Sequence, residues 1–174
     1  MELLREGRVW KFGDNINTDI ILPGAAFRLP LDEQHKLCFS AIRPGWTDAV
    51  RRGDIIIGGE NFGMGSGRPV GTTMRTCGIA AVVAESVNGL CLRNCIGVSL
   101  PALSCPGVSR LFEEGDIARI DFLAGRIENS SRGGAVTTKP LPPLLAEIVA
   151  AGGLVPMLAA GGWIEATPRL AATT

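Results

Sequence analysis

The sequence has no tyrosine, one histidine and few other aromatic residues, which leaves little material for histidine-based catalysis. Only 5% of its 174 residues are aromatic. The histidine, His35, lies in the polar stretch 32–36, where a solvent-exposed side chain is more common than a catalytic one. An excess of charge is also absent, since 17 Lys and Arg balance 17 Asp and Glu. This balance gives no reason to expect a nucleic acid or an anionic membrane as partner.

Long hydrophobic runs are missing as well. No apolar stretch reaches the length of a membrane span without glycine, proline or charge. The first six residues contain no apolar run of the kind found in a signal peptide. We therefore expect a soluble, cytoplasmic protein with no membrane partner.

The cysteines form no Cys-x-x-Cys pair, so we expect no iron–sulfur cluster or other metal within this chain. There are five cysteines, and an odd number without a secretory signal indicates reduced thiols. Cys91 and Cys95 have helical spacing and could be two metal ligands. The interpretation as small buried residues is favoured, because free cysteine is among the most buried residue types.

Composition and hydrophobic patterning predict a single α/β domain. The chain is 46% hydrophobic and 20% charged, and its length suffices for one full core. Apolar runs and turn residues predict strands and helices along the whole chain, with a loop from Asp14 to Gly24. The expected strands are 9–12, 55–57, 79–84, 97–100, 117–122, 127–131 and 135–138. The expected helices are 32–39, 46–51, 70–77, 88–94, 142–151 and 154–160.

The stretch Asn61–Pro69 carries the strongest functional signal. It places three glycines at alternate positions between an expected strand and an expected helix. Glycines let a ligand approach the main chain closely, and successive N–H groups before a helix favour an anion. Ser66 adds a hydroxyl, and Arg68 adds a planar fork suited to a carboxylate or phosphate. The spacing fits neither a Walker A loop nor a dinucleotide fingerprint, so an acid-binding site and a purely structural turn remain the alternatives.

Several ordered motifs resemble the small subunit of 3-isopropylmalate dehydratase. The same domain forms the mobile C-terminal part of aconitase and the small subunit of homoaconitase. The resemblance runs from about Gly7 to Leu158. It rests on the opening Gly7–Gly24 with its element Thr18-Asp19-Ile20-Ile21-Leu22-Pro23, on the glycine loop, on Gly78–Ser86, Leu92–Asn94 and Leu141–Leu144, and on the closing Ala151–Val155.

This resemblance implies a fold and a partner that composition alone does not give. The fold would be a single swivelling β/β/α domain at 1–160, with a mixed sheet, flanking helices and a loose tail at 161–174. A [4Fe–4S] cluster would be held by a separate large iron–sulfur subunit, and this chain would carry no cofactor. Self-association of the isolated chain stays open.

The resemblance also implies roles for residues of this chain. Ser66 corresponds to the family's catalytic base, and Arg68 to the arginine that grips a substrate carboxylate. Arg28 lies in the region that sets substrate choice in the family, although a solvated loop charge is an equal alternative. Asp19 would line the site, whereas the residues alone favour a self-satisfied turn. The remaining residues expected to contact substrate are Thr18, Gly65 and Gly67.

The glycine loop departs from the family pattern at several positions. Met64 stands where the family has cysteine, Gly67 replaces a second serine, and Pro69-Val70 replaces a Glu-His pair. Ser66 and Arg68 are kept. These differences suggest a divergent subgroup acting on a different hydroxy acid.

Two classes of function follow from these observations. The first is the small subunit of a hydro-lyase or isomerase of the aconitase superfamily, which dehydrates a hydroxy di- or tricarboxylic acid such as isopropylmalate or a related malate derivative. A role in leucine biosynthesis would fit that substrate. The second is a non-catalytic carboxylate- or anion-binding regulatory module. A binder of phosphate ligands is a weaker third hypothesis.

Overall fold

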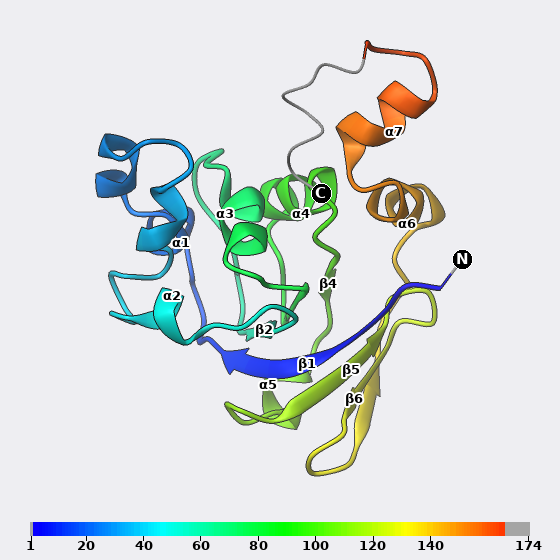
Figure 1. Ribbon diagram of the computed structural model, residues 1–174. Coiled ribbons are helices and arrows are strands. Elements are labelled where there is room, and N and C mark those ends of the chain that lie inside the picture. The colour runs from blue at the N-terminus through cyan, green and yellow to red at the C-terminus, as the bar shows by residue number, and fades with distance from the viewer. Residues whose placement is uncertain (1, 166–174) are drawn as a thin grey trace.

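A seven-stranded mixed sheet organises the chain in the computed structural model, which describes residues 2–165 (Figure 1). The strand order is β4-β3-β2-β1-β5-β6-β7. Strands β1 to β4 pair in parallel, whereas β5, β6 and β7 continue from β1 as an antiparallel meander. The bounds are β1 Leu4–Lys11, β2 Ile55–Gly58, β3 Ala81–Ala84, β4 Ala102–Ser104, β5 Ile117–Asp121, β6 Arg126–Asn129 and β7 Ala135–Thr137.

Helices cover both faces of the parallel strands. Figure 1 shows α3 and α4 on one side of the sheet and the short α5 on the other. The helical bounds are α1 Thr18–Ile21, η1 Gly24–Arg28, η2 Gln34–Leu37, α2 Trp46–Ala49, α3 Val70–Thr76, α4 Gly89–Gly97, α5 Val108–Leu111, α6 Pro143–Ala150 and α7 Leu154–Ala160, where η marks a 3-10 helix. The predicted α/β class with a mixed sheet is confirmed.

The alternation of side chains along the strands divides the interior into two cores. Ile56 and Val82 face the core beneath α1, α3 and α4. Their neighbours Ile55, Ile57 and Val83 face the core shared with α5, α6 and the meander. Because parallel strands are covered on both faces, β2 and β3 consist almost entirely of apolar residues.

Two predictions between the strands were wrong. The loop expected from Asp14 to Gly24 contains α1, because the Asn17 side chain accepts a hydrogen bond from the Ile20 amide and caps a helical turn. The strand expected at 97–100 does not form. Helix α4 runs through Gly97, Ser99 adopts a left-handed φ of 62°, and the strand begins only at Ala102. The alternation of Val98, Ser99 and Leu100 did not distinguish a helix end from a strand.

Smaller differences concern the ends and faces of helices. The helix expected at 32–39 is reduced to the 3-10 turn η2. Leu144 lies off the buried face of α6, because it is 59% exposed while Ile148 and Val149 are buried. No single helix within 2–165 is both long and apolar enough to cross a membrane; α6 and α7 qualify only as a pair bent by 85°. Most of the tail expected to be loose, 166–174, lies outside the described residues.

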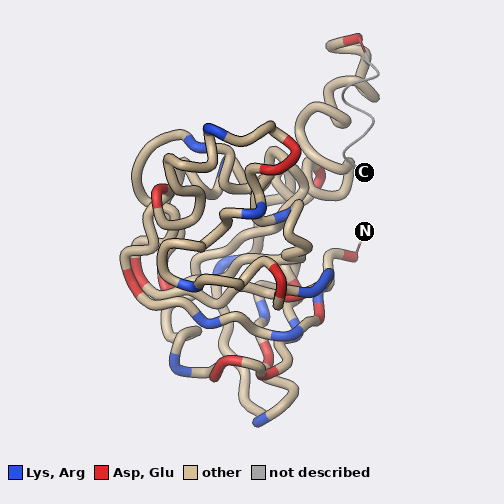
Figure 2. The backbone as a smooth tube through the Cα atoms, turned by 60° about the vertical axis from the view of Figure 1, so that its left-hand side comes forward, with Lys and Arg blue, Asp and Glu red and all other residues tan. Residues whose placement is uncertain are grey.

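Charges of both signs alternate over the chain. Figure 2 shows basic and acidic positions interspersed along the backbone, in keeping with the equal numbers of the two kinds.

The most buried ionic contact is made by Asp54, which precedes β2 and is 4% exposed. Its carboxylate accepts hydrogen bonds from the Arg8 guanidinium at 2.6 Å, the Trp10 indole at 2.7 Å and the Arg51 amide at 2.8 Å. These bonds tie the start of β2 to β1.

The Asp54 carboxyl is held in its charged form. Burial raises its pKa, but the hydrogen bonds from Arg8, the Arg51 amide and Trp10 outweigh burial and leave the pKa lower than usual. A carboxyl whose pKa is lower in the folded state stabilises the fold above its unfolded-state pKa of about 3.9. That contribution disappears as the pH falls through the folded-state pKa.

We therefore expect Asp54→Asn to lower the free energy of unfolding at pH 7 by about 1.5–3 kcal/mol, the range for hydrogen bonds to a charged group. Urea unfolding at pH 7 and at pH 3 measures this free energy for the variant and the parent. The difference between the two proteins should be smaller at pH 3 than at pH 7. Asp48→Asn, at an exposed position, is the control and should change little. A difference that does not depend on pH would contradict this account.

Candidate active site

The glycine loop lies at the carboxyl edge of the parallel strands. It follows β2 and meets the segment that follows β1, because adjacent parallel strands end on the same side. The Thr18 amide donates to the Met64 carbonyl at 2.8 Å, and the Gly63 amide donates to the Ile16 carbonyl at 2.6 Å. On the other side, the Asn61 amide donates to the Ser86 hydroxyl at 2.8 Å, just after β3. Three chain segments thus fix the loop.

Two glycines in the loop are required by their surroundings. Gly63 has a φ of +74°, and an added Cβ would lie 2.2 Å from the Cys91 sulfur. Gly65 has a φ of +116°, and an added Cβ would lie 2.8 Å from the Thr18 hydroxyl oxygen. Gly67 differs, because its φ is not left-handed and an added Cβ would meet only Leu90 at 3.9 Å. The loop therefore packs tightly at Gly63 and Gly65 and is open at Gly67.

Arg68 is held on three sides by the segment that follows β1. Its guanidinium donates to the Leu22 carbonyl at 2.6 Å and forms an ion pair with Asp19. The same guanidinium lies 5.2 Å from the centre of the Phe27 ring. These contacts use part of its five N–H donors and fix the plane of the fork, so the remaining donors have a set direction.

Ser66 lies two residues before this arginine, and its carbonyl oxygen accepts the Arg68 amide at 2.9 Å. Within residues 2–165 the hydroxyl makes no hydrogen bond to protein, and the residue is exposed. The backbone amides of Gly65, Ser66 and Gly67 also have no protein acceptor among the described residues. A row of free amides, a hydroxyl and an oriented guanidinium can together bind a carboxylate.

The Thr18 hydroxyl is buried beneath the loop without a partner. The residue is 2% exposed, and its hydroxyl oxygen forms no hydrogen bond among the described residues. The backbone of Thr18 holds Met64, and its side chain faces Gly65. An unpaired buried hydroxyl normally destabilises a fold, so this oxygen is available to hydrogen-bond a water or a ligand at this edge.

The structure gathers most of the residues expected at the site, but Arg28 stands apart from them. Thr18, Asp19, Gly65 and Arg68 are linked by the contacts above. Arg28 ends η1, is exposed, and makes no side-chain hydrogen bond within the described residues. Its neighbour Phe27 reaches Arg68 instead.

Sequence reasoning missed three contributors: Phe27, the Leu22 carbonyl and Leu90. Asn94 accepts the Gly71 amide at 2.7 Å and so satisfies the start of α3. The local sequence does not indicate this contact, because a side chain of one helix accepts a hydrogen bond from the start of another. Leu90 is an apolar residue at the start of α4 that stays 37% exposed, which only the structure shows.

The other candidate groups among the described residues form no metal site. No cluster of three or more His, Cys, Asp or Glu that could hold a metal occurs among the described residues. Cys91 and Cys95 are buried, with their sulfurs 4.0 Å apart, as the favoured interpretation predicted.

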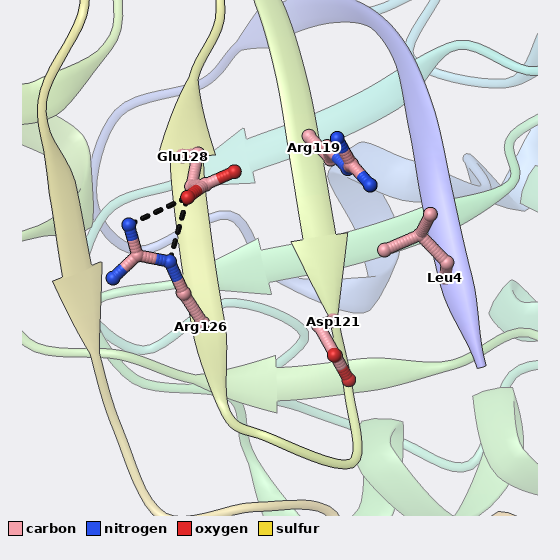
Figure 3. Close-up of a pocket in the computed structure, with 5 residues that line it drawn as sticks. All are labelled: Leu4, Arg119, Asp121, Arg126 and Glu128. Carbon is pink, nitrogen blue, oxygen red and sulfur yellow. Dashed lines mark hydrogen bonds and ion pairs between the residues drawn. The ribbon is translucent and has the colours of Figure 1, made fainter. Parts of the chain in front are cut away.

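A hollow of about 300 Å³ on the meander is lined by Leu4, Arg119, Asp121, Arg126 and Glu128 (Figure 3). The hollow holds the Arg126–Glu128 ion pair and contains no residue of the glycine loop.

Comparison with known proteins identifies the family, although no family model matches the chain. The isopropylmalate/citramalate isomerase small subunit of Methanocaldococcus jannaschii is 39% identical over 163 residues, which cover 91% of this chain and 95% of the relative. The methanogen homoaconitase small subunit of Methanothermobacter thermautotrophicus is 38% identical, covering 89% and 91%. The chain belongs to the family of 3-isopropylmalate dehydratase and homoaconitase small subunits.

A solved structure of this family has the same fold. The crystal structure of 3-isopropylmalate dehydratase from M. jannaschii superposes with a TM-score of 0.84 at 33% identity, covering 92% of this chain and 96% of that one. The 3-isopropylmalate dehydratase small subunit of Halothermothrix orenii is 36% identical, with 90% of this chain and 96% of the relative covered. The resemblance inferred from motifs is therefore confirmed over nearly the whole chain.

The loop glycines should differ in their tolerance to substitution. Gly63→Ala must move the Cys91 side chain and strain a left-handed residue, so we expect it to lower the free energy of unfolding by about 2–4 kcal/mol. Gly67→Ala meets open space and should change it by less than about 0.5 kcal/mol. Guanidinium unfolding of both variants tests this difference. Equal losses at the two positions would show that the packing is not the cause.

Proposed function

We propose that this chain is the small subunit of a hydro-lyase that removes water from a hydroxy di- or tricarboxylic acid and readds it. One observation carries the proposal: the Ser66 hydroxyl makes no hydrogen bond within residues 2–165, and two positions along the same loop Asp19 and Leu22 fix the direction of Arg68. Family membership supports the reaction class, because the relatives are small subunits of dehydratases and of a homoaconitase. A cytoplasmic location fits this assignment.

In this proposal Arg68 binds a carboxylate of the substrate. The contacts to Asp19, Leu22 and Phe27 hold its fork before substrate arrives, so little orientation has to be gained on binding. Asp19 is then a positioning residue for Arg68. The free amides of Gly65 and Gly67 give the acid further hydrogen bonds.

Ser66 removes the proton next to the carboxylate. An ordinary serine is a poor base, so its alkoxide needs stabilisation by neighbouring donors. The loop amides and the positive charge of Arg68 supply it. Thr18 has an unused hydroxyl beneath Gly65 and is the remaining buried donor at this edge.

The metal chemistry belongs to a partner. The described residues contain no set of ligands for a cluster, so we assign the [4Fe–4S] cluster to a large subunit, where it would act as a Lewis acid on the leaving hydroxyl. The word "subunit" in the relatives' names supports such a partner.

The candidate substrates are those of the relatives. Isopropylmalate and citramalate are named for the M. jannaschii relative, and the homoaconitase relative indicates a tricarboxylic acid. We propose that Arg28, at the end of η1 and beside Phe27, influences which acid is accepted. A cation there would favour an additional carboxylate over an alkyl group.

Reconstitution tests the proposal. The chain is mixed anaerobically with its cognate large subunit after the cluster has been rebuilt, and formation of the unsaturated acid is followed with isopropylmalate, citramalate and homocitrate. We expect turnover with at least one acid and none from either subunit alone. Binding of an acid without turnover in the full complex would favour the anion-binding module instead.

Ser66→Ala should abolish most turnover and leave binding intact. The side chain is exposed in the loop, so its loss removes little packing. The kcat should fall by roughly 10²–10⁴-fold, the contribution of a positioned base, with KM nearly unchanged. Steady-state kinetics of the reconstituted complex measure both constants. A rise in KM with an unchanged kcat would assign Ser66 to binding alone.

Arg68→Lys should act in the opposite way. Lysine keeps the charge but cannot contact Leu22, Asp19 and a carboxylate through one planar fork. We expect KM to rise by roughly 10–100-fold, which corresponds to about 1.4–3 kcal/mol. Arg52→Lys, on an exposed turn, is the matched control. An unchanged KM for every acid tested would remove Arg68 from the substrate site.

A further inference from the structure

A cysteine lies at the opposite end of α3 from the glycine loop. Cys77 follows the last residue of α3 and is the one cysteine of the five that is not buried. It lines a hollow of about 600 Å³ together with residues of η2 and α2. His35, Lys36 and Asp48 line the same hollow, so its wall carries groups of both charge signs. Accessible cysteines are the ones that oxidants reach first.

A second thiol lies behind Cys77. Cys38 follows η2 and is 1% exposed. The Cys38 amide and the Cys77 thiol both donate to the carbonyl oxygen of His35, at 2.9 Å and 3.5 Å, so the Cys77 sulfur lies against the turn that carries Cys38. Burial raises the pKa of the Cys38 thiol well above its usual value, and its contact with Cys77 raises it further. Cys38 is therefore a protected thiol next to an accessible one.

We propose that Cys77 is an oxidation site and that Cys38 resolves the oxidised form as an intramolecular disulfide. The Cys77 sulfur attacks one oxygen of hydrogen peroxide, the O–O bond breaks, and sulfenic acid and water form. The Cys38 sulfur then attacks the Cys77 sulfur, the S–O bond breaks, and the departing hydroxide takes up the Cys38 proton as water. Two thiols are oxidised and one peroxide is reduced to two waters.

The other close pair of thiols does not offer this chemistry. Cys91 and Cys95 lie 4.0 Å apart on α4, but both are buried. Cys91 also packs against Gly63. Access therefore distinguishes the two pairs, because an oxidant must first reach one sulfur.

The proposed bond would connect two segments that flank the candidate active site. It would join the end of η2 to the end of α3. Helix α3 begins directly after the glycine loop, and η2 packs against η1, which carries Phe27. Oxidation would thus restrain the segment that contacts Arg68 without involving Arg68 itself.

Peroxide treatment of the full-length chain tests this proposal independently of catalysis. We expect the intact mass to fall by about 2 Da and two of the five free thiols to disappear, with dithiothreitol restoring both. Peptide mapping without reduction should join Cys38 to Cys77. Cys91→Ser should behave like the parent, whereas Cys77→Ser should keep its remaining thiols.

A second measurement does not depend on any variant folding. Brief treatment of the native chain with iodoacetamide should label Cys77 well before the four buried cysteines. A disulfide that maps to Cys91 and Cys95, a parent chain that keeps five thiols in peroxide, or labelling that begins at another cysteine would overturn the proposal.

Discussion

The contact between Arg68 and the segment after β1 is the constraint on which the candidate active site depends. It joins two loops that leave neighbouring parallel strands, and it does so through one guanidinium that reaches a carbonyl, a carboxylate and an aromatic ring. Its ion pair is largely exposed on the Asp19 side, where such pairs contribute only about 0–1 kcal/mol of stability. The contact matters because it orients the Arg68 guanidinium. A planar group fixed at two atoms can point its remaining N–H donors at a ligand in only a few directions.

The sheet and the glycines make this contact possible. Parallel pairing of β1 and β2 brings their carboxyl ends together, so residues 46 positions apart meet at one edge. The loop can then lie flat against Thr18 and Cys91 only because Gly65 and Gly63 lack side chains. The backbone packs closely at Gly63 and Gly65 and is open at Gly67. Ser66, which lies between Gly65 and Gly67, therefore stays exposed. The packing that makes the turn tight therefore also exposes the groups that can bind an anion.

The sequence was sufficient to predict the α/β class, most of the elements and the position of the glycine loop. Continuous apolar runs such as 79–84 predict strands covered on both faces, and β3 is one of them. Local patterns failed at α1, where one side-chain cap decides the structure, and at 97–100, where the residues at a helix end have the pattern of a strand. They also could not reveal Phe27 or the Leu22 carbonyl, because both act through contacts with a residue more than 40 positions away.

The central claim is that Ser66 removes the proton next to the carboxylate of an acid held by Arg68. Exchange of that proton with deuterium from the solvent reports its removal directly, whatever step limits turnover. The measurement compares parent and Ser66→Ala chains in the complex with the large subunit, in D₂O, by mass spectrometry of the recovered substrate. We expect deuterium to enter the substrate with the parent and to stay absent with the variant while substrate still binds. Exchange at the parent rate in Ser66→Ala would contradict the claim and place the base outside this residue.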